Sequence, residues 1–187
     1  MSMCTFTRAA ARMRWLASGA IAAIALTAMP ATPSAAAPVE WDDGELVAIQ
    51  TYSGKCLSVS DFSFENETPI GLSACDHESH QRFRIRHLHH DWAAIETFDG
   101  KCLDAWDHTF ADNTPIIQFH CLDSVSQRFR IEQAGHDTVH IRTAGGKCLD
   151  VSQASLDESV PLLQRRCWNT PYQQFSLEDV DPWWPSE

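Results

Sequence analysis

Six of the seven cysteines in this 187-residue chain form three pairs with one common spacing. The pairs are Cys56 and Cys75, Cys102 and Cys121, and Cys148 and Cys167, and in each the members are nineteen positions apart. A thiol can act as a nucleophile, bind a metal or form a disulfide. Zinc is disfavoured because the chain has no CxxC pair. The even number and fixed spacing predict one disulfide within each pair, each worth about 3 kcal/mol in the chain-entropy model.

Two stretches are rich in histidine and therefore in possible metal ligands. They are His77-Glu78-Ser79-His80 and His87-Leu88-His89-His90-Asp91. Both fall in predicted loops or strand ends, and their counterparts later in the chain are not rich in histidine, so we interpret them as solvated side chains. The chain also has no G-x-S-x-G or H-E-x-x-H motif, and the predicted bridges leave no nucleophilic cysteine. We expect no enzyme activity, no metal site and no cofactor.

The first 36 residues have the pattern of a secretory signal peptide. Arg8, Arg12 and Arg14 precede an apolar run from Trp15 to Met29 and a small-residue stretch from Ala31 to Ala37. The run is shorter and richer in alanine than the ~20 residues of a membrane-spanning helix, so we favour cleavage after Ala36 over an uncleaved anchor. We therefore expect a secreted, extracellular protein with residues 37–40 as a short lead-in.

Cleavage would leave a strongly acidic chain. It removes Cys4 and three arginines but no acidic residue, so 11 basic and 25 acidic side chains remain. The formal charge changes from -11 to about -14. Such a surface repels the phosphates of nucleic acids and anionic lipids. We expect neither nucleic-acid binding nor membrane insertion after signal removal.

A gapless threefold repeat organises the rest of the chain. The motif Gly-Lys-Cys-Leu begins at Gly54, Gly100 and Gly146, a step of 46 residues each time. The same step relates Pro69, Pro115 and Pro161; Gln81, Gln127 and Gln173; and Ile49, Ile95 and Ile141. The repeats span residues 41–86, 87–132 and 133–178, followed by a tail over 179–187. We expect Trp183 and Trp184 in this tail to pack against the folded domain.

Each repeat contains four short strand-like segments, which in the first repeat cover residues 46–51, 56–60, 69–75 and 82–86. Every second side chain is apolar in the segment Arg82-Phe83-Arg84-Ile85-Arg86, as in a strand with one solvated face. Glycine-containing turns such as Asp99-Gly100 separate the first two segments. No stretch of the mature chain has a convincing helical period. The chain is therefore predicted to be all-β, with twelve strands.

One four-stranded unit cannot bury its apolar face alone, so the three units must share a core. Three blades are too few for a propeller, and we predict a β-trefoil, a closed barrel with a threefold cap and pseudo-threefold symmetry. The expected core contains Ile49, Leu57, Ile70, Phe83 and Ile85 with their counterparts in the other repeats. About 140 residues bury enough surface to support such a core.

The repeated motifs resemble the landmarks of the ricin B-type lectin trefoils. The likeness rests on Gly-Lys-Cys-Leu, on Thr-Pro-Ile before the second cysteine and on Gln-x-Phe, and it covers Trp41 to Glu178. In that family each repeat can hold one sugar. An Asp two places after the first cysteine accepts hydrogen bonds from sugar hydroxyls, and a ring two places before the second cysteine stacks on the sugar. A polar residue before the Gln completes the site, so the resemblance implies glycans or glycoconjugates as partners.

Carried over by position, the resemblance favours the middle repeat as the working site. Asp104 is the acceptor, Phe119 is the ring and Ser126 is the polar residue before the Gln. Ile117 stands where the family has a Gln that supports the Asp. Candidate substitutes close in sequence are Trp106, Asp107, His108 and His120. The plainer interpretation is that Asp104 caps a turn and that Phe119 only packs against its neighbours.

The other two repeats depart further from the family pattern. The third keeps the acceptor, Asp150, but has Arg165 in the ring position and Tyr172 before the Gln, which implies a weak or altered site. The first repeat has Ser58 for the Asp and Ser73 for the ring, so its site is expected to be lost. The Gln-x-Phe residues occur in all three repeats whatever the quality of the site, which predicts a role in the core.

Two functions remain open. The leading one is a secreted, non-catalytic, lectin-like trefoil with one or two working sugar sites. The alternative is a trefoil whose sugar sites have degenerated and whose loops bind a secreted protein, for example as an inhibitor. The first repeat and the tryptophan-rich tail motivate the alternative.

Overall fold

The computed structural model describes residues 42–151 and 160–180. The predicted signal peptide, its cleavage site, the lead-in and the tail with Trp183 and Trp184 lie outside the described residues. The four segments predicted in the first repeat agree with the observed strands to within one residue at each end. The strands are β1 (Glu45–Thr51), β2 (Lys55–Val59), β3 (Ile70–Ala74), β4 (Arg82–His87), β5 (Ala93–Glu96), β6 (Cys102–Ala105), β7 (Thr114–Phe119), β8 (Phe129–Gln133), β9 (Val139–Thr143), β10 (Cys148–Val151), β11 (Leu162–Arg165) and β12 (Phe175–Asp179).

The helices in the described residues are single 3-10 turns that lie between strands. They are η1 (Ser60–Phe62), η2 (Ser79–Gln81), η3 (Trp106–His108), η4 (Val125–Gln127) and η6 (Pro171–Gln173). Among the described residues, no helix has the length and apolar character needed to cross a membrane.

Six strands close into a barrel. The first and fourth strands of each repeat pair around a ring in the order β1, β4, β5, β8, β9 and β12, and β12 pairs back with β1. Every pairing is antiparallel. Because the ring is closed, the barrel leaves no sheet edge free for pairing with another chain.

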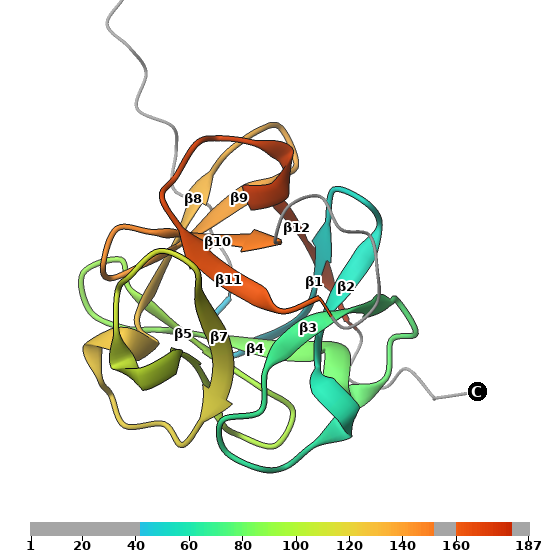
Figure 1. Ribbon diagram of the computed structural model, residues 1–187. Coiled ribbons are helices and arrows are strands. Elements are labelled where there is room, and N and C mark those ends of the chain that lie inside the picture. The colour runs from blue at the N-terminus through green and yellow to red at the C-terminus, as the bar shows by residue number, and fades with distance from the viewer. Residues whose placement is uncertain (1–41, 152–159, 181–187) are drawn as a thin grey trace, which may run out of the picture. The chain divides into compact units, whose positions relative to one another are not determined.

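The other six strands form the hairpins β2–β3, β6–β7 and β10–β11, which surround the pseudo-threefold axis seen in Figure 1. Neighbouring hairpins also touch, because β11 pairs with β7 and Pro69 forms a bridge to Ile117. A six-stranded barrel with three cap hairpins is the β-trefoil, so the predicted fold is confirmed.

The core consists of matching residues from the three repeats. Fully buried triplets lie at Ile49, Ile95 and Ile141, at Leu57, Leu103 and Leu149, and at Phe83, Phe129 and Phe175. Ile70, Ile85 and their counterparts join this cluster, and Leu177 packs against it only partly buried. Each aromatic or large aliphatic side chain contributes roughly 1.5–3 kcal/mol when it is removed from water. The predicted core is confirmed.

Each repeat is closed by its own disulfide, as the spacing predicts. The bridges join Cys56 to Cys75, Cys102 to Cys121, and Cys148 to Cys167, with Cα separations of 5.0, 5.0 and 5.1 Å. Every bridge connects the second strand of a repeat to the segment that follows its third strand, and so fixes the cap hairpin. Bridges of this kind are typical of proteins in oxidising compartments.

Side-chain amides join neighbouring repeats. Gln118 on β7 donates from Nε2 to the carbonyl oxygens of Ser63 and Glu65 in the first repeat, at 2.9 and 2.8 Å. Gln164 on β11 makes the two matching bonds to the second repeat, at 2.8 and 3.2 Å. The first repeat has Leu72 at this position and no amide to donate. Each glutamine therefore holds the loop that precedes the third strand of the preceding repeat.

Aromatic packing adds to this contact. The ring of Phe64 meets that of Phe98 edge to face, with centroids 5.2 Å apart. Phe110, at the position that matches Phe64, instead lies directly over Gly145. The turn of the third repeat therefore has a glycine where that of the second has Asp99.

Replacing Gly145 by alanine should destabilise the fold by about 1–3 kcal/mol through overpacking. A Cβ atom at this position would lie 2.5 Å from the ring carbons of Phe110. The measurement is the free energy of unfolding in urea. The control is the same change in a Phe110→Ala background, where the loss should largely disappear. An equal loss in both backgrounds would mean that this contact is not the cause.

Candidate functional site

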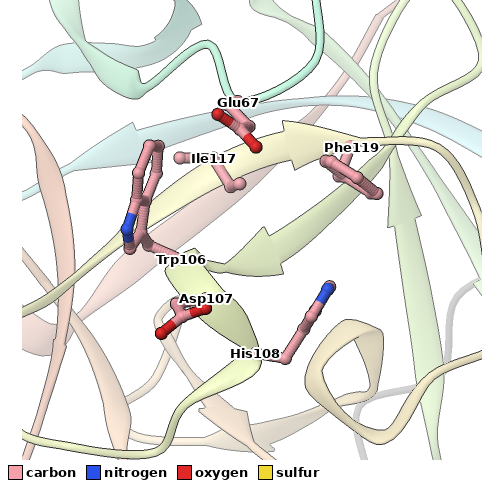
Figure 2. Close-up of a pocket in the computed structure, with 6 residues that line it drawn as sticks. All are labelled: Glu67, Trp106, Asp107, His108, Ile117 and Phe119. Carbon is pink, nitrogen blue, oxygen red and sulfur yellow. The ribbon is translucent and has the colours of Figure 1, made fainter.

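The middle repeat contains an open hollow of about 140 Å³. Figure 2 shows its six lining residues, which are Glu67, Trp106, Asp107, His108, Ile117 and Phe119. Trp106, Asp107 and His108 form the turn η3, and Ile117 and Phe119 come from β7. Glu67 belongs to the first repeat, and its backbone N–H donates to the carbonyl oxygen of Gln118 at 2.9 Å. The hollow is therefore shared between two repeats.

Asp104 lies beneath this hollow and does not line it. Its side chain is fully buried, and its Oδ1 atom is 3.3 Å from Nδ1 of His108. Oδ2 lies 3.2 Å from the same nitrogen but outside hydrogen-bond geometry. His108 Nδ1 is also 3.0 Å from the hydroxyl of Ser126, which is buried as well. The predicted acceptor and the predicted polar residue therefore both meet His108, and its half-exposed side chain separates them from solvent.

The three side chains Asp104, His108 and Ser126 do not have the geometry of a catalytic triad. In such a triad the carboxylate and the serine bind different nitrogens of the imidazole. Here both contacts converge on Nδ1. The arrangement fixes the histidine ring and does not connect the serine to a base through Nε2.

The local backbone explains why His108 covers Asp104. Asp107 and His108 have φ angles of 54° and 52°, and the matching pair Asp61 and Phe62 has 54° and 51°. This left-handed conformation is unfavourable for residues other than glycine and persists only where the surroundings impose it. It turns the chain back over β6, so that the fourth residue after the Asp lies above the carboxylate.

Phe119 and Trp106 supply the apolar surface of the hollow. The ring of Phe119 stands perpendicular to that of His108, at 87° with a centroid distance of 5.8 Å. Trp106 is 43% exposed. Ile117 pairs with Asp104 across the strands and replaces the amide expected there by an apolar group. His120 is exposed near Phe119 and is not among the lining residues.

The third repeat brings its predicted residues together in a different way. Arg165 lies over Asp150, with Nη1 3.8 Å from Oδ1, and its Nε donates to Oδ1 of Asn113 at 2.6 Å. Tyr172 packs edge to face on Tyr52, at a centroid distance of 5.2 Å, and against the core. The carboxylate of Asp150 is thus paired within the protein, and Tyr172 is partly buried in contacts with Tyr52 and the core.

In the first repeat, aromatic rings occupy the matching place. Phe62 lies against the ring of His80, with centroids 3.5 Å apart. Phe62 and His108 are 46 positions apart, and so are His80 and Ser126. This register makes His108 the counterpart of Phe62, but the sequence does not show that the side chain at this position covers the second strand. Glu67 also had no sequence signal, because it reaches the site from a neighbouring repeat.

The three repeated glutamines hold the loop of the second cysteine. Gln81, Gln127 and Gln173 are each at most 2% exposed. Each accepts from the backbone near that cysteine through Oε1 and donates from Nε2 to a carbonyl oxygen of the same segment. These contacts agree with the structural role expected from their repetition.

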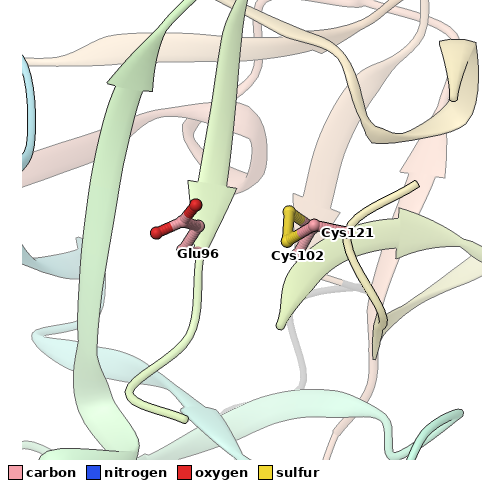
Figure 3. A group of neighbouring side chains, drawn as sticks. All are labelled: Glu96, Cys102 and Cys121. Carbon is pink, nitrogen blue, oxygen red and sulfur yellow. A yellow bond between two sulfur atoms is a disulfide. The ribbon is translucent and has the colours of Figure 1, made fainter. Parts of the chain in front are cut away.

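Possible metal ligands come close together at one place among the described residues, at Glu96, Cys102 and Cys121 (Figure 3). Both sulfur atoms are joined in a disulfide, so they cannot act as thiolate ligands. Residues of the stretch 87–91 line an open hollow of about 800 Å³ with Trp92, Asp123 and Arg128. The rings of His89 and His90 are 6.5 Å apart there.

The barrel, its three cap hairpins and their register define a β-trefoil domain. The family model for the ricin-type beta-trefoil lectin domain matches residues 45–175, more than half of the chain. The chain therefore belongs to this family, and the resemblance seen in the sequence is confirmed. No curated protein sequence matches the chain.

Solved structures share the fold at low sequence identity. The designed threefold symmetric protein ThreeFoil has a TM-score of 0.70 at 22% identity, over 72% of this chain and 99% of its own. An exo-beta-1,3-galactanase from Clostridium thermocellum has a TM-score of 0.71 at 22% identity, over 75% of this chain and 31% of its own. The Macrolepiota procera ricin B-like lectin, solved with lactose, has a TM-score of 0.65 at 14% identity, over 76% of this chain and 100% of its own.

Asp150 should make the stability of the protein depend on pH. Burial raises the pKa of its carboxyl, and the hydrogen bond from Gln173 and the charge of Arg165 offset this only in part. Between the ordinary carboxyl pKa and the raised one, the folded state holds a proton that the unfolded state has lost. The contribution of Asp150 to the free energy of unfolding is therefore largest below the ordinary pKa and falls as pH rises through this range.

The measurement is the free energy of unfolding of the wild type and of Asp150→Asn across the acidic range. An asparagine oxygen can still accept from Gln173 but carries no charge. The wild type should lose stability relative to the variant as pH rises, and parallel curves would contradict the assignment.

Proposed function

We propose that the mature chain is a secreted, non-catalytic carbohydrate-binding protein whose working site is the hollow of the middle repeat. The observation that carries this proposal is that two aromatic surfaces, Phe119 and Trp106, and several polar groups line one open hollow. Phe119 stands at the position where the family has its sugar-stacking ring. An aromatic ring covers the CH face of a sugar, while polar groups bind its hydroxyls. Membership of a lectin family supports the same function.

In this proposal Asp104 acts through His108. The buried carboxylate holds the imidazole by Nδ1, and Nε2 has no hydrogen-bond partner among the described residues. That nitrogen and the carboxylates of Glu67 and Asp107 are the groups that meet sugar hydroxyls. The arrangement differs from the family pattern, in which the Asp itself meets the sugar.

A single shallow site of this size binds weakly. A millimolar dissociation constant corresponds to about -4 kcal/mol, so useful retention needs several contacts on one polymer or several copies of the protein. The third repeat is a weaker candidate, because Asp150 is already paired with Arg165. We propose glycans with repeated terminal units as the natural partners.

The alternative, a protein-binding trefoil, has one observation in its favour. Phe62 and Phe64 in the first repeat are 48% and 64% exposed, and Phe62 occupies the place of the sugar site. Exposed aromatic side chains are common where proteins bind one another. A loop variant that abolishes capture of a secreted protein, where Phe119→Ala does not, would favour this second function.

Phe119→Ala should weaken glycan binding about tenfold, because it removes the stacking surface at a cost of roughly 1 kcal/mol or more. The best glycan would first be found on an array with the mature protein, and its affinity would then be measured by calorimetry. Phe62→Ala, at the aromatic residue of the first repeat, is the matched control and should leave the affinity unchanged. Absence of any bound glycan, or equal losses in both variants, would refute the proposed site.

A further inference from the structure

A second hollow lies on the barrel wall, where β4 runs between β1 and β5. It has a volume of about 250 Å³, and its lining includes Arg82, Arg84, Glu96, Thr97 and Phe98. It shares no lining residue with the hollow of the middle repeat. The volume is just below the roughly 300–1,000 Å³ of pockets for drug-sized ligands, which suits a single sugar ring.

Two guanidinium groups face this hollow from one strand. Arg82 and Arg84 are two positions apart on β4 and therefore point to the same, outward face. The Nε of Arg82 donates to the carbonyl oxygen of His77 at 2.8 Å. This bond fixes the side chain and leaves its Nη groups available to a ligand. Arg84 is exposed, and within the described part of the chain neither arginine forms an ion pair with a carboxylate.

The nearby carboxylates are already neutralised. Glu96 belongs to the hollow, but its Oε1 atom accepts from Nη1 of Arg86 at 2.7 Å, and this bond raises the pKa of Arg86. Figure 3 shows Glu96 at the end of β5. Asp99, in the adjoining turn, is paired with Lys101. The two arginines are therefore left with unsatisfied positive charge in a chain of net charge -11.

One wall of the hollow is aromatic. Phe98 is held by the edge-to-face contact with Phe64, at 68° and 5.2 Å, and by packing against the core. A rigid ring beside two arginines offers an apolar face and an anion site within one small volume. Arginine forks match the geometry of a carboxylate, and a phenyl ring covers sugar CH groups.

We propose that this barrel-wall hollow binds a carboxylated sugar residue of the uronic acid type, with its carboxylate on Arg82 and Arg84 and its ring on Phe98. The two oxygens of a single carboxylate can each accept a hydrogen bond from one of the two guanidinium groups. The acidic surface around it opposes long polyphosphates, because it repels their further charges. The site is independent of the proposed function of the middle repeat.

The test is an NMR titration of the isotope-labelled mature protein with sodium D-glucuronate, D-glucose and sodium acetate at low ionic strength. The amide signals of Thr97, Phe98 and Gly100 report on the hollow. Glucuronate should give saturable shifts in the millimolar range, and glucose and acetate should each bind at least about tenfold more weakly, because each lacks half of the contacts. Added salt should weaken glucuronate binding.

Variants decide which groups are responsible. Arg84→Gln should weaken glucuronate about tenfold, since it removes a charged donor from an exposed position without disturbing the core. Arg166→Gln, at an exposed arginine outside the hollow, is the charge-matched control and should change nothing. Phe119→Ala should also leave glucuronate binding intact, which separates this site from the middle repeat.

Three results would overturn the proposal. Equal affinity for glucuronate and glucose would show that the arginines take no part. Equal affinity for glucuronate and acetate would show a general anion site, which an acidic side chain of another protein could equally occupy. Equal losses in Arg84→Gln and Arg166→Gln would show that only net charge matters.

Discussion

The structure depends on one constraint, which is that no single repeat can bury its own apolar side chains. Phe83, Phe129 and Phe175 become fully buried only because the three repeats meet around one axis. This shared core fixes how the three repeats align with one another, and that alignment determines which strands pair in the barrel. The disulfides stabilise each cap hairpin separately, but the position of one hairpin relative to the next follows from the common interior.

The same arrangement separates the parts that must stay alike from those that can differ. Core positions are alike in the three repeats. The position above the second strand differs, because it is Phe62 in the first repeat and His108 in the second. A change there alters what the hollow offers to a ligand and removes nothing from the interior. The bonds from Gln118 to the loop of the first repeat also bring Glu67 to the edge of the middle hollow, so this hollow depends on the neighbouring repeat.

The fold could be predicted from the sequence because its determinants are periodic. Strand alternation, the 46-residue step and the cysteine spacing all depend on position along the chain, and the disulfide partners followed from them. Asp104 and Phe119 led to the prediction of a sugar site in the middle repeat, which stays a prediction, and Phe119 but not Asp104 lines the hollow found there. The burial of Asp104 beneath His108 was not predicted, because it depends on a left-handed turn at Asp107 that no residue type there demands. The role of Glu67 and the open charge of Arg84 arise from contacts between distant segments and have no local pattern.

The barrel closes through the pairing of its first and last strands, since Thr51 at the end of β1 lies opposite Phe175 at the start of β12. A chain still emerging from a ribosome or a translocation pore therefore cannot complete its ring until the last strand is free. Until then the edges of β1 and β9 that pair with β12 have unpaired backbone groups. An unpaired strand edge is a template for pairing with another chain, so closure of the ring by β12 also protects the protein from aggregation.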